Sequence, residues 1–313
     1  MPMDIFTLQQ IEDQLKVFMQ HAQKPLVVVM GPTASGKSRL AVDLAKAFHG
    51  EVINADSRQV YQEIVVGNAL TSEEEMQGVP HHLFSHVPLS WPYNVAQYKA
   101  EAESKIEDIQ ARGKLPILCG GTFLWIDAVV DNFSIPVVEP DMGRREELEQ
   151  LDVESLLEQL SAVDPEGAVR LREDRNKRSI IRALEIYRQT GQTKSALASR
   201  GERKVQVFKV APFWEREQLY ERIDQRAEVQ LHSGLIEEVG ALIDRYADGI
   251  PERLLELRWP SLTSIGCKEL VPYWQGVIHL EQLLVKLQQV NRNYAKRQLT
   301  WLRRDDEIRW LRW

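Results

Sequence analysis

The sequence has few cysteines and no long apolar run. Its two cysteines among 313 residues, Cys119 and Cys267, stand far apart, and neither belongs to a C-x-x-C pair. This excludes a disulfide framework and a thiolate zinc site, and we expect a reducing, cytoplasmic setting. Apolar stretches such as 26–30 are far shorter than the roughly 20 residues that cross a bilayer, so no membrane partner is expected. Charged residues interrupt the first 24 residues, which argues against a signal peptide.

A net positive charge is also lacking. The chain carries 39 Lys and Arg against 46 Asp and Glu, a formal charge of −7, which argues against a protein that coats nucleic acid indiscriminately. Residues 286–313 differ, because they hold eight basic and three acidic residues, a local charge of +5 that leaves −12 for the remainder. Such a basic, Trp-containing end is either a solvated helix face or a docking surface for a polyanion.

Short apolar runs alternate with amphipathic segments in the first part of the chain. Residues 26–30, 52–56 and 115–119 are typical of buried strands, whereas 38–48 and 98–112 have helical periodicity. Strands that alternate with helices predict a parallel α/β sheet with right-handed connections.

The pattern changes after Asp131. Pro136 and Pro140 interrupt the chain, and the polar segment that follows has a helical period until about Arg203. Residues 205–212 again predict a strand, and a last long helix is expected over 280–304. The expected parts are an N-terminal helix (1–24), the first part of the α/β core (25–131), a helical insertion domain (132–204), and the core return with C-terminal helices (205–313).

One motif predicts a phosphate site. The segment Gly31-Pro-Thr-Ala-Ser-Gly-Lys-Ser38 matches G-x-x-x-x-G-K-[ST] directly after a predicted strand and at the start of a predicted helix. Its glycines allow backbone N–H groups to surround a phosphate, Lys37 reaches a terminal phosphate, and the Ser38 hydroxyl is placed to ligate Mg²⁺. The diphosphate- or nucleotide-binding residues are Gly31, Pro32, Thr33, Ala34, Ser35, Gly36, Lys37 and Ser38. The loop does not identify its ligand, although ATP is the commonest ligand of such loops. The predicted fold is a P-loop NTPase-like parallel sheet with a helical insertion and a helical C-terminal region.

Asp56 stands at the end of the second predicted strand. Its distance from Gly36 would suit a ribose-binding carboxylate of a dinucleotide fold, but the loop lacks G-x-G-x-x-G. Two interpretations remain: a structural or metal-shell carboxylate, and a general base beside the phosphate site.

Several motifs in order resemble those of the tRNA dimethylallyltransferases (tRNA isopentenyltransferases). The motifs are Gly31-Pro-Thr-Ala-Ser-Gly-Lys-Ser38, Asn54-Ala-Asp-Ser-Arg-Gln-Val-Tyr61, Pro80-His-His-Leu83, Gly120-Gly-Thr122, Arg182-Ala-Leu-Glu-Ile-Tyr187, Ile265-Gly266 and Lys296-Arg-Gln-Leu-Thr-Trp-Leu-Arg303. The resemblance runs from about Pro25 to Arg312 and is most specific at the motifs that begin with Asn54 and with Lys296.

The resemblance implies transfer of a dimethylallyl group from dimethylallyl diphosphate to N6 of the adenine at position 37 of tRNA. The P-loop then binds the diphosphate of the prenyl donor, and Lys37 with Ser38-bound Mg²⁺ neutralises the leaving group. The implied catalytic residues are the base Asp56, Thr33 near the amine, the pyrophosphate-contacting Arg226, and Thr122 near the reaction channel. Without the resemblance, Arg222 and Arg226 would be interpreted as an exposed helix pair.

The resemblance also implies contacts with the anticodon stem-loop of tRNA and a monomeric enzyme. Matching tRNA-binding positions are Asp56, Ser57, Arg58, Gln59, Arg178, Arg182, Lys268, Lys296, Arg297, Gln298, Thr300, Trp301 and Arg303. Asn68, Ser85, Ser179 and Cys267 depart from the family pattern. These departures bear on tRNA affinity and choice more than on the chemistry.

Three alternatives stay open at this point. An adenylate isopentenyltransferase would use the same donor on free AMP, ADP or ATP, but would lack the motif at 296–303. A small-molecule kinase would use ATP, but would not need the segment at 54–61. A non-catalytic tRNA-binding paralogue is compatible with the departures at Asn68 and Ser179, whereas the intact P-loop and Asp56 count against it.

Overall fold

The computed structural model describes residues 4–133, 135, 141–197 and 201–313. The strands in these ranges are β1 (Ile5–Phe6), β2 (Pro25–Met30), β3 (Gly50–Asn54), β4 (His81–His82), β5 (Leu115–Gly120), β6 (Gln206–Phe213) and β7 (Arg309–Arg312). They form one sheet in the spatial order β1-β7-β6-β2-β5-β3-β4, with every neighbouring pair parallel. The predicted parallel α/β architecture is therefore confirmed.

Strand β2 is central to the sheet and positions the site. Its residues 26–30 are buried, and Val28 pairs with Leu118 of β5 on one side and Lys209 of β6 on the other. Because β2, β3 and β5 are parallel, their carboxyl ends meet at the same edge of the sheet, where α/β folds bind ligands. The P-loop, Asp56 and Thr122 follow these three ends.

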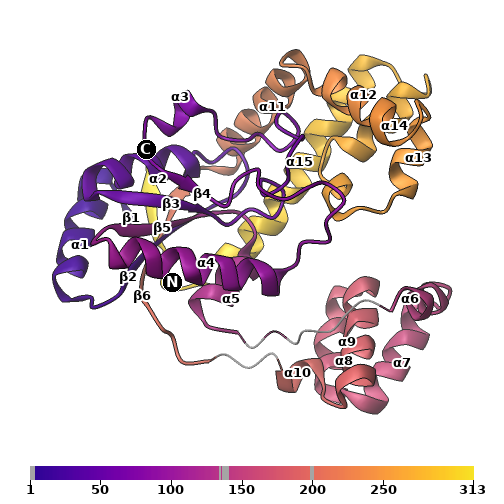
Figure 1. The fold of residues 1–313 in the computed structure, drawn as a ribbon, viewed down its shortest axis with the longest axis horizontal. Helices are drawn as coiled ribbons and strands as arrows, with labels where there is room; N and C mark the ends of the chain where they lie inside the picture. The colour runs from indigo at the N-terminus through magenta and orange to yellow at the C-terminus, as the bar shows by residue number, and fades with distance from the viewer. Residues whose placement is uncertain (1–3, 134, 136–140, 198–200) are drawn as a thin grey trace. The chain divides into compact units, whose positions relative to one another are not determined.

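Helices before residue 131 and after residue 205 accompany this sheet, and the first two of them pack on it (Figure 1). These helices are α1 (Leu8–His21), α2 (Lys37–Phe48), α3 (Glu73–Met76), α4 (Val95–Ala111), α5 (Phe123–Val130), α11 (Arg216–His232), α12 (Leu235–Tyr246), α13 (Pro251–Glu256), the 3₁₀ turn η1 (Pro260–Thr263), α14 (Cys267–Trp274) and α15 (Leu280–Leu302). Helices α1 and α2 share one buried apolar cluster with the sheet, containing Ile11, Leu15 and Leu40. Among the helices of the described residues, none combines the length and apolar character needed to cross a membrane.

Two C-terminal helices close on the P-loop. Helices α11 and α15 run side by side (Figure 1). Their buried contact is formed by Leu219, Ile223 and Ala295, against which Ala34 of the P-loop and Leu299 pack. Polar side chains of both helices are thereby brought to the carboxyl edge of the sheet.

The chain divides into two compact units: residues 1–126 with 204–313, and residues 127–203. The second unit contains α6 (Met142–Glu149), α7 (Val153–Val163), α8 (Pro165–Asp174), α9 (Lys177–Thr190) and α10 (Lys194–Leu197). Leu156, Leu160 and Ile180 belong to its own apolar core. The unit is helical, as the periodicity of residues 132–204 predicts. Pro136 and Pro140, which interrupt the sequence pattern, lie outside the described residues.

Both ends of the chain contain a strand that the sequence did not predict. The segment expected as an N-terminal helix begins with β1, and the segment expected to be helical at the C-terminus ends with β7. Ile5 pairs with Trp310, and Phe6 with Leu311. Strands this short show no readable alternation, and their partners lie about 300 residues away. The last long helix ends at Leu302 instead of Arg304.

Candidate active site

The P-loop backbone takes conformations that favour small residues. Ala34 and Gly36 have φ angles of 60° and 87°, in the left-handed region. A Cβ atom added to Gly31 would lie 2.7 Å from Ser35 Oγ. Gly36 is the N-cap of α2 and offers no side-chain acceptor, so the N–H groups of the first helical turn are left for an anion.

Polar side chains complete this phosphate cradle. Ser35 is fully buried, and its Oγ has no hydrogen-bond partner. Lys37 and Ser38 are half-buried in the first turn of α2. Burial lowers the pKa of Lys37, while the charge of Asp56 opposes this shift. A Cβ atom added to Gly121 would lie 3.7 Å from Asp56 Oδ2 and 3.4 Å from the Gly31 carbonyl oxygen, so the carboxylate lies close to the start of the P-loop.

Helix α11 brings two arginines to the same loop. Arg226 Nη1 donates to Thr33 Oγ1 at 2.8 Å, and Arg222 Nε donates to the Ala34 carbonyl at 2.9 Å. The Arg222 guanidinium also lies 4.4 Å from the centroid of the Trp214 ring. Burial lowers the pKa of Arg226, and Asp56 opposes the shift. An arginine stays protonated under such conditions, so α11 supplies fixed positive charge. The interpretation of Arg222 as an exposed helix residue misses this contact.

Asp56 is held by the end of β3. The Asn54 side chain accepts from the Asp56 N–H at 2.9 Å and donates to the Asp56 carbonyl at 3.1 Å. Asp56 Oδ1 accepts from the Arg58 N–H at 3.0 Å. Its Oδ2 faces Gly121, where an added Cβ would lie 3.7 Å away. At Gly120 an added Cβ would lie 2.1 Å from the Ala55 carbonyl oxygen, so this close approach of β5 requires glycine.

Thr122 fixes the turn that follows Asp56. Its Oγ1 accepts from the Ser57 N–H at 2.9 Å and lies 3.2 Å from Ser57 Oγ, to which it donates. The Thr122 N–H donates to the Ala55 carbonyl at 3.1 Å. Thr122, expected near the reaction channel, thus contacts the segment that carries Asp56.

Gln298 connects α15 to both sides of the site. Its Oε1 accepts from the Thr33 N–H at 2.9 Å, and its Nε2 donates to the Gly121 carbonyl at 3.0 Å. The side chain is only 4% exposed. The resemblance places Gln298 among the tRNA-contacting residues, but both ends of its amide are used within the protein.

The other expected tRNA-binding residues fall into three groups. Lys296, Arg297 and Arg303 are exposed along α15, together with Trp301, which is 41% exposed and stacks on Phe123 at 6.3 Å between ring centroids. Thr300 is also exposed there, and its hydroxyl donates to a carbonyl of its own helix.

The second and third groups lie elsewhere. Arg58 Nη1 donates to the Pro260 carbonyl at 2.5 Å, and Gln59 Nε2 to the Ala69 carbonyl at 2.8 Å. Lys268 is exposed at the start of α14. Arg178 and Arg182 belong to α9 of the second unit, where Arg182 Nη1 donates to Glu185 Oε2 at 3.0 Å.

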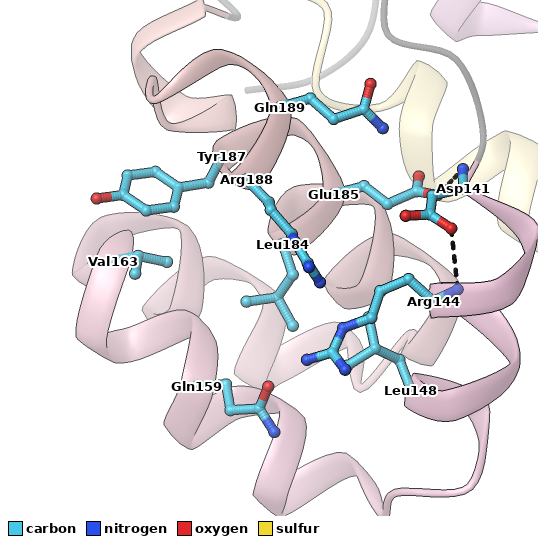
Figure 2. A pocket seen from close by; sticks show the side chains of 10 residues that line it. All are labelled: Asp141, Arg144, Leu148, Gln159, Val163, Leu184, Glu185, Tyr187, Arg188 and Gln189. Carbon is cyan, nitrogen blue, oxygen red and sulfur yellow. Dashed lines mark hydrogen bonds between the residues drawn. The ribbon is translucent and has the colours of Figure 1, made fainter.

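Each of the two units contains a hollow. A hollow of about 190 Å³ next to the P-loop is lined by Pro32, Trp214, Lys296 and Arg303. The second unit has a separate hollow of about 400 Å³ (Figure 2), which Arg144 and Arg188 line together with carboxylates and apolar side chains.

Fold and site together define a P-loop α/β protein with a strand-end carboxylate beside its phosphate-binding type of loop. A family model described as IPP transferase matches residues 59–305. The tRNA dimethylallyltransferase of Bacillus pumilus is 38% identical over 299 residues, which cover 93% of this chain and 91% of that protein. The tRNA dimethylallyltransferase 1 of Citrifermentans bemidjiense is 40% identical over 299 residues, 94% of each chain.

Solved structures agree with these matches. The tRNA isopentenylpyrophosphate transferase of Bacillus halodurans superposes with a TM-score of 0.68 at 37% identity, covering 93% of this chain and 90% of that one. A eukaryotic dimethylallyltransferase described as acting on tRNA superposes with a TM-score of 0.76 at 30% identity, covering 93% and 74%. The chain belongs to the IPP transferase family, and the predicted family and P-loop fold class are confirmed.

Proposed function

We propose that this chain transfers a dimethylallyl group from dimethylallyl diphosphate to N6 of the adenine at position 37 of tRNA and releases diphosphate. The relatives named above are tRNA dimethylallyltransferases by name, which supports transfer of a dimethylallyl group to tRNA. The observation that supports it most directly is the placement of one carboxylate, Asp56, beside the P-loop: its Oδ2 and the Gly31 carbonyl oxygen would lie 3.7 and 3.4 Å from a Cβ atom added to Gly121.

These groups suit the chemistry of the transfer. An exocyclic adenine amine is a poor nucleophile, so its attack is helped by removal of a proton and by stabilisation of the leaving group. The new C–N bond forms as the allylic C–O bond breaks, and the proton passes from nitrogen to Asp56. We assign Oδ2 to this proton because Oδ1 already accepts from Arg58 N–H. The diphosphate leaves into the field of Lys37, Arg226 and the α2 N-terminus.

Thr33 lies between the two halves of this reaction. Its hydroxyl accepts from Arg226, and since a hydroxyl also carries one hydrogen to donate, it can contact the diphosphate or the amine. Its N–H is held by Gln298. Thr122 acts on the same site indirectly, by holding Ser57 next to Asp56.

The residues present fit Mg²⁺ carried by the diphosphate. Mg²⁺ usually keeps several waters and takes few protein ligands besides substrate phosphates. Ser38 offers one hydroxyl in the first turn of α2, and the buried Ser35 Oγ without a partner marks an incompletely satisfied polar cradle. The described part of the chain contains no group of three His, Cys, Asp or Glu residues able to form a separate metal cage. When bound, Mg²⁺ would neutralise charge on the leaving diphosphate.

The target adenine must leave its stack to reach Asp56, so the enzyme has to hold the anticodon stem-loop open. We assign Ser57, Arg58 and Gln59 to the extruded nucleotide, and the exposed Lys296, Arg297 and Arg303 of α15 to phosphates. This set of exposed cations favours tRNA over free AMP as the acceptor.

We further propose a monomer that acts in the reducing cytoplasm. Cys119 and Cys267 are buried free thiols, and burial raises the pKa of each to about 12. Both therefore stay protonated and unreactive, which suits a protein without disulfides.

Prenyl transfer from labelled dimethylallyl diphosphate with Mg²⁺ tests the proposal, with unmodified tRNA and AMP offered in parallel. Label in N6-prenyladenosine after digestion of the tRNA is the expected result. We expect Asp56→Asn to lower kcat by about 10² to 10⁴ by removing the base, while tRNA affinity changes less than threefold. Asp13→Asn, an exposed carboxamide change on α1, should leave kcat unchanged.

Three outcomes would overturn the assignment. Label on AMP alone would identify an adenylate isopentenyltransferase, and undiminished turnover in Asp56→Asn would exclude Asp56 as the base. A protein that binds tRNA but transfers no label to either acceptor would be a non-catalytic paralogue.

A further inference from the structure

One half-buried carboxylate, Glu238, holds the loop that follows the proposed adenine-binding segment. Glu238 of α12 accepts from three consecutive backbone N–H groups: Val65 at 2.6 Å, Val66 at 2.8 Å and Gly67 at 2.8 Å. Three converging amides form a site for an anion, and here a side chain of the protein fills it. The space is tight, because a Cβ added to Gly67 would lie 3.2 Å from Glu238 Oε2.

A second side chain, Gln230, bonds to backbone carbonyls of the same loop. Gln230 Nε2, on α11, donates to the Val66 carbonyl at 2.7 Å and to the Gly67 carbonyl at 3.2 Å. Two side chains from neighbouring helices thus bond the N–H groups of residues 65–67 and the carbonyls of residues 66 and 67, while the Val65 carbonyl accepts from the Leu70 N–H at 3.0 Å. Arg226, four residues before Gln230, holds Thr33 of the P-loop.

The loop is in turn bonded to Arg58 and Gln59. Asn68 Nδ2 donates to the Arg58 carbonyl at 2.8 Å, and Gln59 Nε2 donates to the carbonyls of Ala69 at 2.8 Å and Asn68 at 3.2 Å. Asn68 is 7% exposed. This residue departs from the family pattern, yet its side-chain amide is built into the contact that joins the two segments.

We infer that Glu238 is a positioning residue for tRNA recognition, acting through the loop 65–69 on Arg58 and Gln59. The inference rests on the proposed function. A carboxylate is needed because it offers only acceptors to three donors, whereas a glutamine would turn an NH₂ group toward at least one N–H. Loss of this contact frees the loop and loosens the two side chains assigned to the extruded adenine. The P-loop side of the site keeps its own contacts to Arg226.

The test is a separation of KM values. For Glu238→Gln we expect the KM for tRNA to rise about tenfold, because three charge-assisted hydrogen bonds that hold the loop are weakened or lost, while the KM for dimethylallyl diphosphate stays within about twofold. Glu237→Gln is the matched control, since Glu237 is the exposed neighbour on the same helix. A tRNA anticodon stem-loop with 2-aminopurine at position 37 should show less fluorescence gain with Glu238→Gln.

A second variant covers a failure of Glu238→Gln to fold. Gln230→Met removes the donors to Val66 and Gly67 with little change of size, and should raise the KM for tRNA in the same direction. An unchanged KM for tRNA in either folded variant, or an equal rise of both KM values, would overturn the inference. If the wild-type protein transfers no prenyl group to tRNA, the proposed function fails instead, so the two failures are distinguishable.

Discussion

At the scale of single residues, Gln298 shows how one side chain can connect two parts of the site. It bonds to the Thr33 N–H in the phosphate cradle and to the Gly121 carbonyl beside Asp56. The distance between donor and acceptor subsites therefore depends on a buried amide of α15. A positioning role predicts an effect on both substrates, whereas a direct tRNA contact predicts an effect on tRNA alone.

Gln298→Met separates these two roles. The substitution leaves the Thr33 N–H without its acceptor, and we expect kcat/KM to fall by about tenfold or more with a higher KM for dimethylallyl diphosphate. Steady-state kinetics with each substrate varied in turn provide the measurement. Gln289→Met on the exposed face of the same helix is the control. A rise of the KM for tRNA only would return Gln298 to the tRNA-binding residues.

The sequence was sufficient to position the P-loop residues and Asp56, because each follows a buried strand and parallel strand ends share an edge. Thr122 was indicated by the resemblance to the family. It was not sufficient for Gln298 or Glu238. Their contacts span 265 and about 170 residues, and a polar side chain on a helix has no local pattern that reveals a distant backbone partner. The i,i+4 spacing of Arg222 and Arg226 did indicate a shared helix face, but not what that face contacts.

At the scale of elements, Glu51 of β3 holds one side of the sheet together. It is 2% exposed, and its carboxylate accepts from Arg112 at 2.5 and 2.8 Å and from Lys114 at 2.6 Å. His82 Nε2 of β4 lies 2.8 Å from Glu51 Oε2. These contacts join β3, β4 and the turn between α4 and β5. Hydrogen bonds from Arg112 in particular hold the pKa of Glu51 far below its ordinary value of 4.5.

A depressed folded-state pKa makes the contribution of Glu51 dependent on pH. The stabilisation is complete above about pH 5 and is lost as the pH falls below 4.5, because the unfolded chain takes up the proton first. We expect Glu51→Gln to lower the free energy of unfolding by about 2 kcal/mol at pH 7. The difference in the free energy of unfolding between Glu51→Gln and wild type should become smaller as the pH falls below 4.5.

Urea unfolding at pH 7, 5 and 3.5 measures this gap. Glu107→Gln, an exposed position on α4, should show no comparable loss at pH 7. A gap that stays constant, or widens, as the pH falls would show that Glu51 does not contribute through its ionised carboxylate.

Elements differ in how far their sequence determines them. Strands β2 and β5 are continuous apolar runs buried on both faces, so the sequence predicts them directly. Strand β7 was missed, because its four residues are only two adjacent apolar residues between two arginines, within an otherwise charged end. Tertiary pairing with β6 defines it, and the buried Lys209 of β6 is paired with Asp305 and Glu307 at 2.7 Å each just before β7 begins.

At the scale of the whole molecule, charge is distributed unevenly. A chain with a formal charge of −7 carries a +5 segment at residues 286–313, and three of its cations, Lys296, Arg297 and Arg303, are exposed. An acidic body with one basic surface discourages indiscriminate binding to nucleic acid and leaves the attraction at the proposed tRNA site.

This distribution predicts which basic residues control the salt dependence of tRNA binding. Each phosphate neutralised on a single-stranded loop contributes about 0.7 to the slope of log Kd against log salt concentration. Removing Lys296 and Arg297 together as K296A/R297A should therefore reduce that slope by about 1.4 and weaken binding most at low salt. Lys24→Ala should leave the slope unchanged, because exposed Lys24 precedes the amino end of β2 while the P-loop follows its carboxyl end. Filter binding from 50 to 300 mM KCl provides the measurement. Equal slopes for the double variant and wild type would mean that α15 presents these cations to solvent only, and the tRNA would have to be held by another surface.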